Sequence, residues 1–367
     1  MHGLISVVGA GCSGLVAARR LGELGFEPVV YDQKSVLGVP VRASGILSLS
    51  GLKGLGIDYS GCVTNVLHGA NIHSGGRTMR IISKDAIANV LDRKKLNDAC
   101  REQAEEKGAR VITGRRISGA LLDDLAGKGV VIGADGAVSS VARHFGLGEI
   151  ERLVLTYKAE FEVEAPDSRV VDLFFDNREY AGLFAWLCPN EKDLLEVGVG
   201  IRSGHESSKA AFDRFMKTDY VKGLVGRRRP VAEGASIIPM SLRSRIADDA
   251  RKVVLVGDAA GQVKPTTGGG IIFGGNGALM AADTMGRHIS AGAPLSDYER
   301  RFRKKYGLDL KLHSAINSIY SCLGPGAMGN IIVMLNALGI DRFLGAYGDM
   351  DSPSLVLKRF FLRSLAR

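Results

Sequence analysis

The sequence predicts an α/β protein, α+β overall, with a parallel sheet in one domain and an antiparallel sheet in another. Three observations lead to this prediction. A buried-type strand near the N-terminus leads into a glycine-rich turn and a helix. Two later apolar strands end in Gly-Ala-Asp-Gly and Gly-Asp, and a central region alternates in short strand-like runs. The 367 residues exceed one typical domain, and 46% hydrophobic residues suffice for a large core and a smaller second lobe.

The charge of the chain favours an anionic partner. The formal net charge is +9, but Lys and Arg are scattered and aromatic residues make up only 6%, so no nucleic-acid partner is predicted. Phosphate-bearing small molecules or an anionic membrane surface fit this charge better. The five cysteines are odd in number and form no Cys-x-x-Cys pair, which argues against a disulfide framework and a structural metal site. We therefore expect a cytoplasmic protein without a bound metal.

The first predicted elements are a strand, a tight turn and a helix. Leu4 to Val8 is apolar, Gly-Ala-Gly-Cys-Ser-Gly follows, and apolar residues then recur with helical spacing. Gly9 permits the turn, Gly11 lets the backbone approach a pyrophosphate, and Gly14 allows close packing of the helix on the strand. A GxGxxG motif alone is weak evidence, so the elements that follow it decide whether it is a dinucleotide-binding motif.

An acidic residue at the end of the next strand supplies that context. Pro28 to Tyr31 is strand-like, and Asp32 follows it 18 residues beyond Gly14. A carboxylate in this place accepts hydrogen bonds from a ribose diol, although an ordinary strand-end turn residue is the alternative. The combination predicts a Rossmann-like dinucleotide site. It prefers FAD or NAD to NADP, because an acid disfavours a 2′-phosphate.

A charged helix and a third strand are predicted next. The strand is Ala109 to Thr113, and the helix lies between Asn89 and Gly108 on the basis of its apolar positions Val90, Leu91, Leu96, Ala99 and Ala104. The helix carries Arg93. From its spacing alone, Arg93 is interpreted as a solvated cation on a helix with many other charges.

Two later strands each end in small residues and one carboxylate. Val130 to Ile132 leads into a Gly-Ala-Asp-Gly turn that contains Asp135, and Val253 to Val256 leads into Gly257 and Asp258. Such strand ends bring backbone amides and an acceptor to a polyol chain. Each turn taken singly is also compatible with a simple strand-to-helix connection.

A run of three glycines and an isoleucine follows the second of these turns. A helix-compatible stretch then continues to about Ile289. Glycines at a helix start let the backbone of Gly269, Gly270 and Ile271 reach a flat ring and its electron-rich carbonyl edge. A purely structural loop seldom needs three consecutive glycines, so these residues are predicted to bind a cofactor.

Together the motifs resemble the flavoprotein superfamily that contains aromatic hydroxylases and geranylgeranyl reductases. Motif order and wide spacing match over residues 4 to 320. The resemblance implies a Rossmann-like FAD-binding domain of this type, an antiparallel-sheet substrate domain and a helical C-terminal region. It also implies that Asp258 binds the ribityl chain and that Asp135 supports the pyrophosphate side.

Two segments resemble the reductase branch of this superfamily. The Pro-x-x-Gly-Gly-Gly-Ile pattern is typical of reductases, and Gly261 stands where hydroxylases often carry a His. The segment from Gly38 to Ile46 is similar to the reductase segment beside the flavin, where many relatives carry a Cys at the position of Ala43. The resemblance therefore implies cofactor contacts along this segment and elsewhere, from Arg42, Ala43, Ser44, Gly45, Ser13, Arg93 and the backbone near Ile117.

The middle of the chain is predicted to form an antiparallel sheet, from strand-like runs at Lys158–Val163, Val170–Phe175, Gly182–Leu187 and Leu194–Ile201. The sequence Phe-Ala-Trp-Leu-Cys-Pro partly resembles the reductases' Tyr-x-Trp-x-Phe-Pro motif. A period of two places Phe184, Trp186 and Cys188 on one face, which is either the core of the sheet or the wall of an isoprenoid tunnel. We assign Trp186 and Phe184 to the tunnel and leave the proton donor unassigned.

The predicted domains are discontinuous. Residues 1–65, 85–150 and 245–292 form the FAD-binding domain, 66–84 and 151–244 the substrate domain, and 293–367 a C-terminal helical region. Helices are expected at Leu295–Cys322, Ala327–Leu338 and Ser354–Leu365.

Neither a secretory signal nor an apolar run of membrane-spanning length is found in the sequence. The helix expected at Ser354–Leu365 is basic and amphipathic, so it either packs on the body of the protein or rests on anionic lipid. Any membrane contact is therefore expected to be peripheral, on the cytoplasmic face.

The first functional hypothesis is an FAD-dependent reductase that saturates geranylgeranyl double bonds, in prenyl diphosphates or archaeal ether-lipid precursors. Its electron donor is NADPH, ferredoxin or another reductant. The chain has no second GxGxxG motif for a separate nicotinamide domain. A flavin monooxygenase is the second hypothesis. The third is a prenyl-binding carrier without flavin, against which the intact glycine motifs argue.

Overall fold

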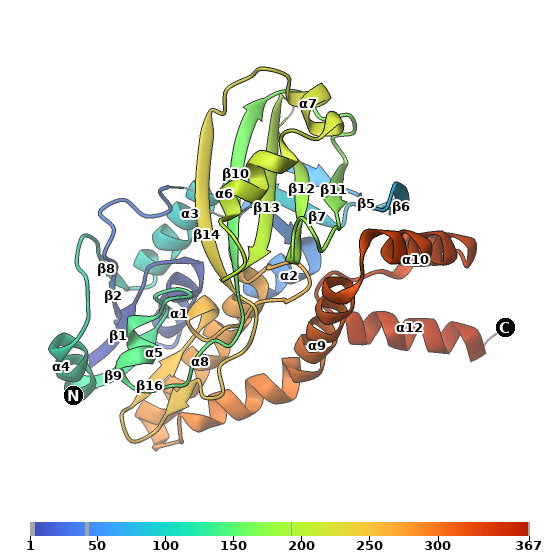
Figure 1. The fold of residues 1–367 in the computed structure, drawn as a ribbon. Helices are drawn as coiled ribbons and strands as arrows, with labels where there is room; N and C mark the ends of the chain where they lie inside the picture. Colours follow the sequence, from blue (N-terminus) through green and yellow to red (C-terminus); the bar gives the residue numbers. More distant parts are fainter. Residues whose placement is uncertain (1–3, 41–43, 192, 366–367) are drawn as a thin grey trace.

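The computed structural model describes residues 4–40, 44–191 and 193–365, and it combines two large sheets with a row of C-terminal helices (Figure 1). The parallel sheet carries the N-terminus, and the second, mainly antiparallel sheet lies beside it. The expected α/β fold with two kinds of sheet is confirmed. The predicted domain boundaries remain an interpretation of this architecture.

The first sheet has six strands in the order β15-β16-β9-β1-β2-β8. The strands are β1 (Leu4–Val8), β2 (Val29–Tyr31), β8 (Arg110–Ile112), β9 (Gly129–Gly133), β15 (Ala247–Asp248) and β16 (Val253–Leu255). All neighbours are parallel except β15, which pairs antiparallel with β16. This arrangement brings the turns after β1, β9 and β16 to one edge of the sheet, because parallel strands end on the same side.

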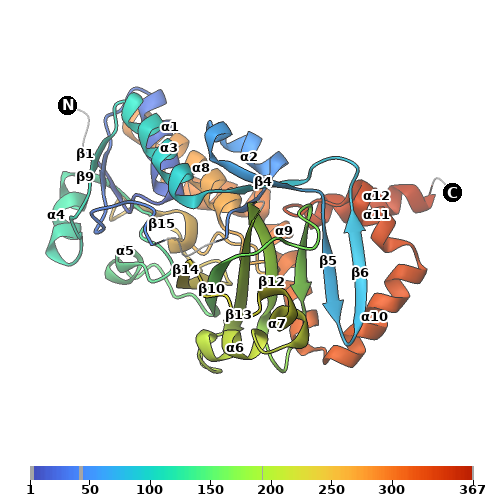
Figure 2. The same ribbon diagram turned by 90° about the horizontal axis from the view of Figure 1, so that it is seen from above.

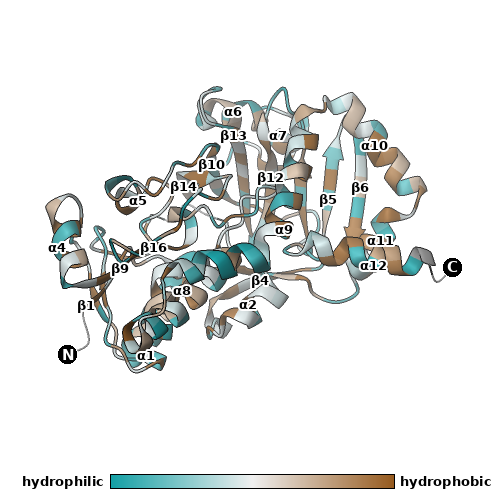
Figure 3. Ribbon diagram, turned by 90° about the horizontal axis from the view of Figure 1, so that it is seen from below, coloured by the Kyte–Doolittle hydropathy of each residue, from teal (hydrophilic) through white to brown (hydrophobic). Residues whose placement is uncertain are grey.

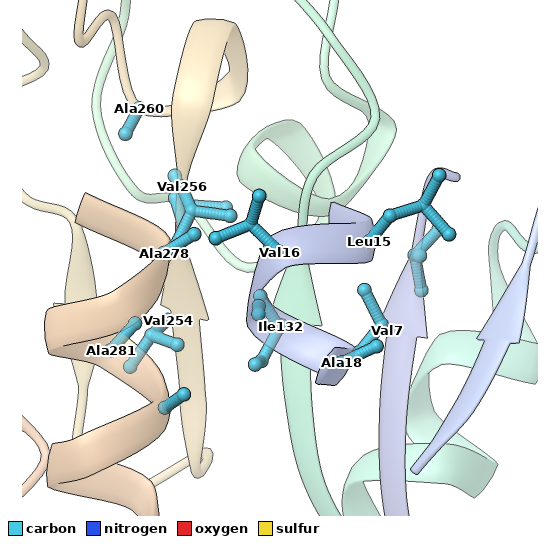
Figure 4. Close-up of a cluster of buried hydrophobic side chains, with 14 of the residues drawn as sticks. Val7, Leu15, Val16, Ala18, Ile132, Val254, Val256, Ala260, Ala278 and Ala281 are labelled. Carbon is cyan, nitrogen blue, oxygen red and sulfur yellow. The ribbon is translucent and has the colours of Figure 1, made fainter. Parts of the chain in front are cut away.

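Three helices pack together beside this sheet (Figure 2). Helix α1 (Cys12–Glu23) contacts both α3 (Arg93–Glu106) and α8 (Ile271–Ala291). Figure 4 shows the core that results, in which side chains of α1 meet those of three strands and α8; the labelled residues are Val7, Leu15, Val16, Ala18, Ile132, Val254, Val256, Ala260, Ala278 and Ala281. Small residues on α8 let it approach α1 closely.

The structure corrects the helix expected between Asn89 and Gly108. Val90 and Leu91 belong to a strand, β7 (Ala88–Leu91), which pairs with β3 (Ile46–Ser48) and β4 (Val63–Leu67) in a three-stranded sheet. The helix begins only at Arg93. The Asp92 side chain accepts the backbone N–H groups of the two residues after Arg93 and so fixes the start of the helix.

The second large sheet has seven strands in the order β14-β10-β13-β12-β11-β5-β6. They are β5 (Gly69–Ser74), β6 (Arg77–Ile82), β10 (Leu153–Glu162), β11 (Val170–Phe174), β12 (Gly182–Glu191), β13 (Leu194–Arg202) and β14 (Ala232–Pro239). Every pair is antiparallel except β5 with β11. The hairpin of β5 and β6 thus adds a segment from early in the chain to the predicted antiparallel sheet.

The two faces of the seven-stranded sheet have different partners. One face packs under α6 (Ser208–Phe215) and α7 (Asp219–Val225), as Figure 2 shows. The opposite face carries Trp186 and packs with residues of β3, β4 and β7, near the cofactor domain. The Trp186 face is therefore the one that can present a substrate to a bound cofactor.

The C-terminal region contains four helices: α9 (Ser296–Cys322), α10 (Pro325–Ala337), α11 (Ile340–Tyr347) and α12 (Pro353–Leu365). Helix α11 was not among the predicted elements. Helix α9 runs from α8 and β15 to β12, and α10 and α11 cover β6 (Figure 2). Among the described residues, α10 and α11 together, bent by 74°, have the length and hydropathy of a membrane span, whereas no one helix does.

The remaining elements are short connections: α2 (Leu49–Leu55), the 3₁₀ turn Ser60–Cys62, α4 (Ala120–Lys128), α5 (Ser140–His144) and the 3₁₀ turn Gly257–Ala259. The last of these begins within the predicted Gly-Asp motif.

Candidate functional site

The N-terminal glycine turn has the geometry that its sequence predicts. Gly9 has φ +108°, and a Cβ there would lie 2.3 Å from the carbonyl oxygen of Ala134. A Cβ at Gly14 would lie 2.0 Å from the carbonyl oxygen of Gly9, so only glycine lets α1 pack on β1. A Cβ at Gly11 would meet nothing within 4 Å, which leaves open space above the start of α1. Backbone N–H groups of this helix end face that space and can bind an anion.

Asp32 stands beside this turn and holds its shape. Its two carboxylate oxygens accept the backbone N–H groups of Ala10 and Lys34, each at 2.8 Å. A pocket of about 370 Å³ opens here, and Asp32, Gly9, Gly11, Asp135 and Ile117 are among the residues that line it. The predicted ribose acceptor therefore faces the same pocket as the glycine turn.

Basic side chains, which sequence reasoning did not select, also line the pocket. They are Lys34, Arg115 and Arg116. The Arg115 guanidinium also lies 5.7 Å from the ring centre of Tyr31. Positive charge at the mouth of the pocket complements a pyrophosphate. The signal in the sequence is the pair of arginines that follows β8 after Thr113 and Gly114.

Asp135 shapes this pocket by accepting hydrogen bonds from the backbone of the loop after β9. Its carboxylate accepts the N–H groups of Ser140 and Val141, at 2.7 and 3.1 Å, and the hydroxyl groups of Ser139 and Ser140. It thereby caps α5 and fixes the loop after β9. In this geometry, the predicted support of the pyrophosphate would come from Asp135 holding the loop after β9 in place, with no direct contact to the phosphates.

A second group of residues meets where α1, α8 and the Gly-Asp turn converge. Gly257 has φ +63°, and a Cβ there would lie 2.6 Å from Ser13 Oγ. Gly270 precedes α8 without a capping side chain, and a Cβ there would lie 2.8 Å from Asp258 Oδ1. Ser13, Asp258 and the predicted glycines before Ile271 therefore lie together, and the first N–H groups of α8 remain available for an electron-rich ring edge.

Asp258 and Arg93 are charged groups of this site that act on each other electrostatically. Burial raises the pKa of Asp258 to about 6, and the positive charge of Arg93 opposes this rise only in part. Arg93 Nη1 is buried without a hydrogen-bond partner among the described residues. A buried nitrogen of Arg93 left unpaired beside the Asp258 carboxyl indicates a missing polar ligand. The hydroxyl-rich and carbonyl-bearing flavin half of FAD fits both groups, and Arg93 is more than a solvated cation.

Lys264 packs against the glycine turn that precedes α8, and this residue was not selected from the sequence. Its Nζ donates to Asp351 Oδ1 at 2.5 Å, and the Ser48 hydroxyl also donates to Asp351. A Cβ at Gly269 would lie 3.0 Å from Lys264 Cε. The C-terminal region is thereby linked to the turn before α8. A lone lysine in an apolar, glycine-rich stretch was the available signal.

The segment predicted to run beside the flavin is partly described. Arg42 and Ala43 lie outside the described residues. Gly45 packs on β7, where a Cβ would lie 2.0 Å from the carbonyl oxygen of Leu91. Ser44 donates its hydroxyl hydrogen to Glu196. Ser44 and Gly45 thus connect the start of α3, where Arg93 lies, with the seven-stranded sheet.

Trp186 and Phe184 are buried on the sheet face that packs toward the cofactor domain. Their ring centres lie 6.2 Å apart in an edge-to-face arrangement. The Trp186 indole covers Gly198, where a Cβ would lie 2.1 Å from the ring, and its Nε1 donates to Glu196 Oε1 at 2.7 Å. The packing fits both a core and a tunnel wall, so the tunnel role stays a prediction. Sequence reasoning missed Glu196, although it is the one acid in the apolar run Leu194–Ile201.

Comparison with known proteins decides the family. The family model described as the FAD binding domain matches residues 4–294, which is more than half of the chain. The chain belongs to this FAD-binding family. FAD is therefore the cofactor of the site, and the protein is an FAD-dependent oxidoreductase. The alternative of a carrier without flavin is set aside.

Relatives extend over nearly the whole chain. An uncharacterised protein of Methanocaldococcus jannaschii is 25% identical, covering 96% of this chain and 94% of its own. Digeranylgeranylglycerophospholipid reductase 1 of Methanothermobacter thermautotrophicus is 28% identical and covers 89% of each chain. A solved geranylgeranyl bacteriochlorophyll reductase-like protein of Thermoplasma acidophilum has a TM-score of 0.79 at 20% identity, covering 97% of this chain and 95% of its own. This last similarity concerns the fold.

Asp258 gives a test of the site that needs no substrate. In the protein without FAD, the carboxyl has a folded pKa of about 6 against an ordinary 3.8, so its neutral form stabilises the fold. That stabilisation is complete below pH 3.8 and is lost as the pH rises through about 6; the difference corresponds to roughly 3 kcal/mol. Asp258→Asn stays neutral, so urea unfolding of the FAD-free variant should lose this pH dependence. Equal pH dependence in both proteins would contradict the placement of Asp258.

Proposed function

We propose that the protein saturates double bonds of an isoprenoid lipid, namely the geranylgeranyl chains of a prenyl diphosphate or of an archaeal ether-lipid precursor. The observation that carries this proposal is the apolar, aromatic sheet face at Trp186, which meets the cofactor domain at Ser44. An isoprenoid chain is recognised mainly by burial of apolar surface. The names of the reductase relatives support the same substrate class.

Different groups of described residues bind the cofactor and surround the substrate. The amides at the start of α8, Asp258 and Arg93 hold the flavin half of FAD, which supplies a hydride when it is reduced. Phe184 and Trp186 exclude water from the alkene, which has no polar group of its own. Burial raises the pKa of the Cys188 thiol well above its ordinary value, so Cys188 remains neutral and contributes apolar surface.

The decisive test is anaerobic incubation of the reduced holoenzyme with geranylgeranyl diphosphate or a geranylgeranylated glycerophospholipid. We expect each saturated bond to add the mass of two hydrogens, seen by mass spectrometry. Dithionite serves first as reductant, and NADPH and reduced ferredoxin are then tried separately to identify the donor. An aromatic substrate that gains oxygen in air, with every prenyl lipid unchanged, would establish the monooxygenase instead.

The C-terminal helices are the surface by which the enzyme reaches a lipid substrate. Figure 3 shows apolar ribbon on α10 and α11. Many large apolar side chains are exposed here: Leu308, Ile316, Ile319, Val333, Met334, Leu338, Leu355, Leu357, Phe360, Phe361 and Leu362. A cleft of about 720 Å³ between α11 and α12 is lined by such residues together with Arg342 and Arg363. Apolar area bordered by arginines suits the cytoplasmic face of an anionic membrane.

Lipid binding by this surface is tested with vesicles. We expect the protein to sediment with vesicles that contain phosphatidylglycerol, to do so less at high salt, and to bind phosphatidylcholine vesicles weakly. Phe361→Asp together with Leu362→Asp should abolish sedimentation. Val231→Asp is the matched control, because Val231 is equally exposed, at 54% against 61% and 58%, but lies before β14. Identical sedimentation of both variants would exclude this surface.

A further inference from the structure

A buried polar cluster lies between the cofactor domain and the Trp186 face of the sheet. At its centre is Glu196 of β13, whose side chain is only 3% exposed. Glu196 Oε2 accepts a 2.5 Å hydrogen bond from Lys158 Nζ of β10. Its Oε1 accepts one from Trp186 Nε1 and another from the hydroxyl of Ser44. One carboxylate therefore gathers donors from two other strands and from the segment beside the cofactor.

This cluster is linked to the cofactor site through residues that neighbour one another along two short segments of the chain. Ser44 is followed by Gly45, which packs on Leu91 at the end of β7. Arg93 begins α3 two residues later, and its charge acts on Asp258. A short line of residues thus leads from Glu196 to the groups that hold the flavin half of FAD.

The charges of the cluster are costly for the fold. An apolar set of similar volume is often as stable as a buried ion pair, so stability alone does not account for a lysine and a glutamate at this depth. Burial lowers the pKa of Lys158, but the nearby carboxylates of Glu196 and Glu160 outweigh burial and raise it above the ordinary value. Lys158 is therefore a buried ammonium that donates its proton toward Glu196.

Saturation of an alkene needs such a proton. The hydride adds to one carbon with its electron pair, and the π electrons of the double bond form the second C–H bond with a proton. The isolated alkene carries no acidic group, and water is largely excluded from the apolar face. The proton must therefore come from the chain or from a water held by it.

We propose that Lys158, Glu196 and Ser44 form a relay that supplies this proton, an inference that rests on the proposed function. Lys158 passes a proton to Glu196, and the carboxyl turns about its Cγ–Cδ bond and donates to Ser44 Oγ. Ser44 gives its own hydroxyl hydrogen to the alkene carbon, since a hydroxyl both accepts and donates. Lys158 is left neutral and regains a proton from solvent, so charge and atoms balance.

The relay is tested by Glu196→Gln in the FAD-loaded enzyme. Gln keeps the shape of the side chain and one acceptor oxygen for Trp186 and Ser44, but its NH2 group cannot accept from Lys158 and it cannot carry the proton. Reoxidation of the reduced flavin by geranylgeranyl lipid, followed without oxygen in a single turnover, should slow by about 10² to 10⁴-fold. Glu160→Gln is the matched control, because Glu160 also accepts from Lys158, at 3.1 Å, but no hydrogen bond joins it to Ser44 or Trp186 in the described structure. Loss of the Glu160 charge removes one of the two carboxylates that raise the pKa of Lys158 but leaves Lys158, Glu196 and Ser44 connected, so this variant should slow turnover far less than Glu196→Gln.

Tryptophan emission gives a readout independent of turnover. Trp186 is the only tryptophan of the chain, and its indole N–H donates to Glu196. Removing the carboxylate charge in Glu196→Gln should shift the emission maximum in the FAD-free protein, whereas Glu160→Gln should leave it unchanged. This comparison checks that the carboxylate lies where the relay requires it.

Ser44 variants keep the inference testable if Glu196→Gln does not fold. Ser44→Ala leaves the ion pair intact but removes the last hydroxyl, so it should lose turnover even when it is saturated with FAD. Ser44→Thr keeps the hydroxyl and should therefore retain turnover. Normal turnover in Glu196→Gln or Ser44→Ala, or equal losses in Glu196→Gln and Glu160→Gln, would overturn the relay alone. A wild-type holoenzyme that reduces no prenyl lipid would instead overturn the proposed function.

Discussion

Asp258→Ala should give a colourless protein that no longer retains FAD on purification. Asp258 lies against Gly270 at the start of α8, where its carboxylate is the acceptor for the polyol chain of the cofactor. A charge-assisted hydrogen bond of this kind contributes about 1.5 to 3 kcal/mol, or roughly 10- to 100-fold in affinity. Absorbance of oxidised flavin and acid extraction of the bound compound measure the loss.

The control for this substitution is Asp283→Ala, which removes a carboxylate from the exposed side of the same helix. Asp283 bonds Arg20 at 2.8 Å, and both side chains are about one third exposed, at 36% and 35%. We expect full FAD content in this variant and a stability change below about 1 kcal/mol. If Asp258→Ala keeps FAD to the same extent, the ribityl chain must lie elsewhere.

Lys158→Met should destabilise the protein more than any surface substitution, by about 3 to 5 kcal/mol. The lysine side chain is 5% exposed and pairs with the equally buried Glu196. Its removal leaves the buried Glu196 carboxylate with only the neutral donors Trp186 and Ser44, so no cation offsets the cost of its desolvation. Urea unfolding monitored by circular dichroism gives the free energy of unfolding.

A second substitution separates lost charge pairing from lost packing. Lys158→Met combined with Glu196→Gln removes both charges, so it should recover much of the stability lost in the single variant. Lys209→Met removes the cation from an exposed pair with Asp213 and should cost about 0.5 kcal/mol or less. A double variant as unstable as Lys158→Met would point to packing of the lysine stem as the main effect.

Much of the cofactor domain was predictable because its constraints are local. Gly9 and Gly14 are required by backbone contacts of 2.3 and 2.0 Å, and such close approaches leave a motif in the sequence. The start of α3 was misplaced for a related reason. Val90 and Leu91 fit a helical pattern as well as a strand, and only the pairing of β7 with β3 and β4 decides between them.

The polar residues of the site were harder to predict because their partners are distant in sequence. Glu196 depends on Ser44, and Lys264 depends on Asp351, so neither forms a motif. The predicted face of Phe184 and Trp186 was found by its period of two, but the period cannot tell a core from a substrate wall. Helix α11 was missed since it is a short element between two longer ones.

The parallel sheet also determines the order in which the newly made chain can fold. β1 pairs with β9, more than a hundred residues later, and β9 pairs with β16, which ends at Leu255. The segment between β9 and β16 includes most of the seven-stranded sheet, which is itself held together by neighbouring strands. On the ribosome, the parallel sheet of the cofactor domain therefore cannot be completed until about two thirds of the protein has emerged. Until then, the edges of its first strands lack their pairing partners. Nascent chains of this protein are thus most exposed to aggregation before β16 is synthesised, and FAD can stabilise only the finished fold.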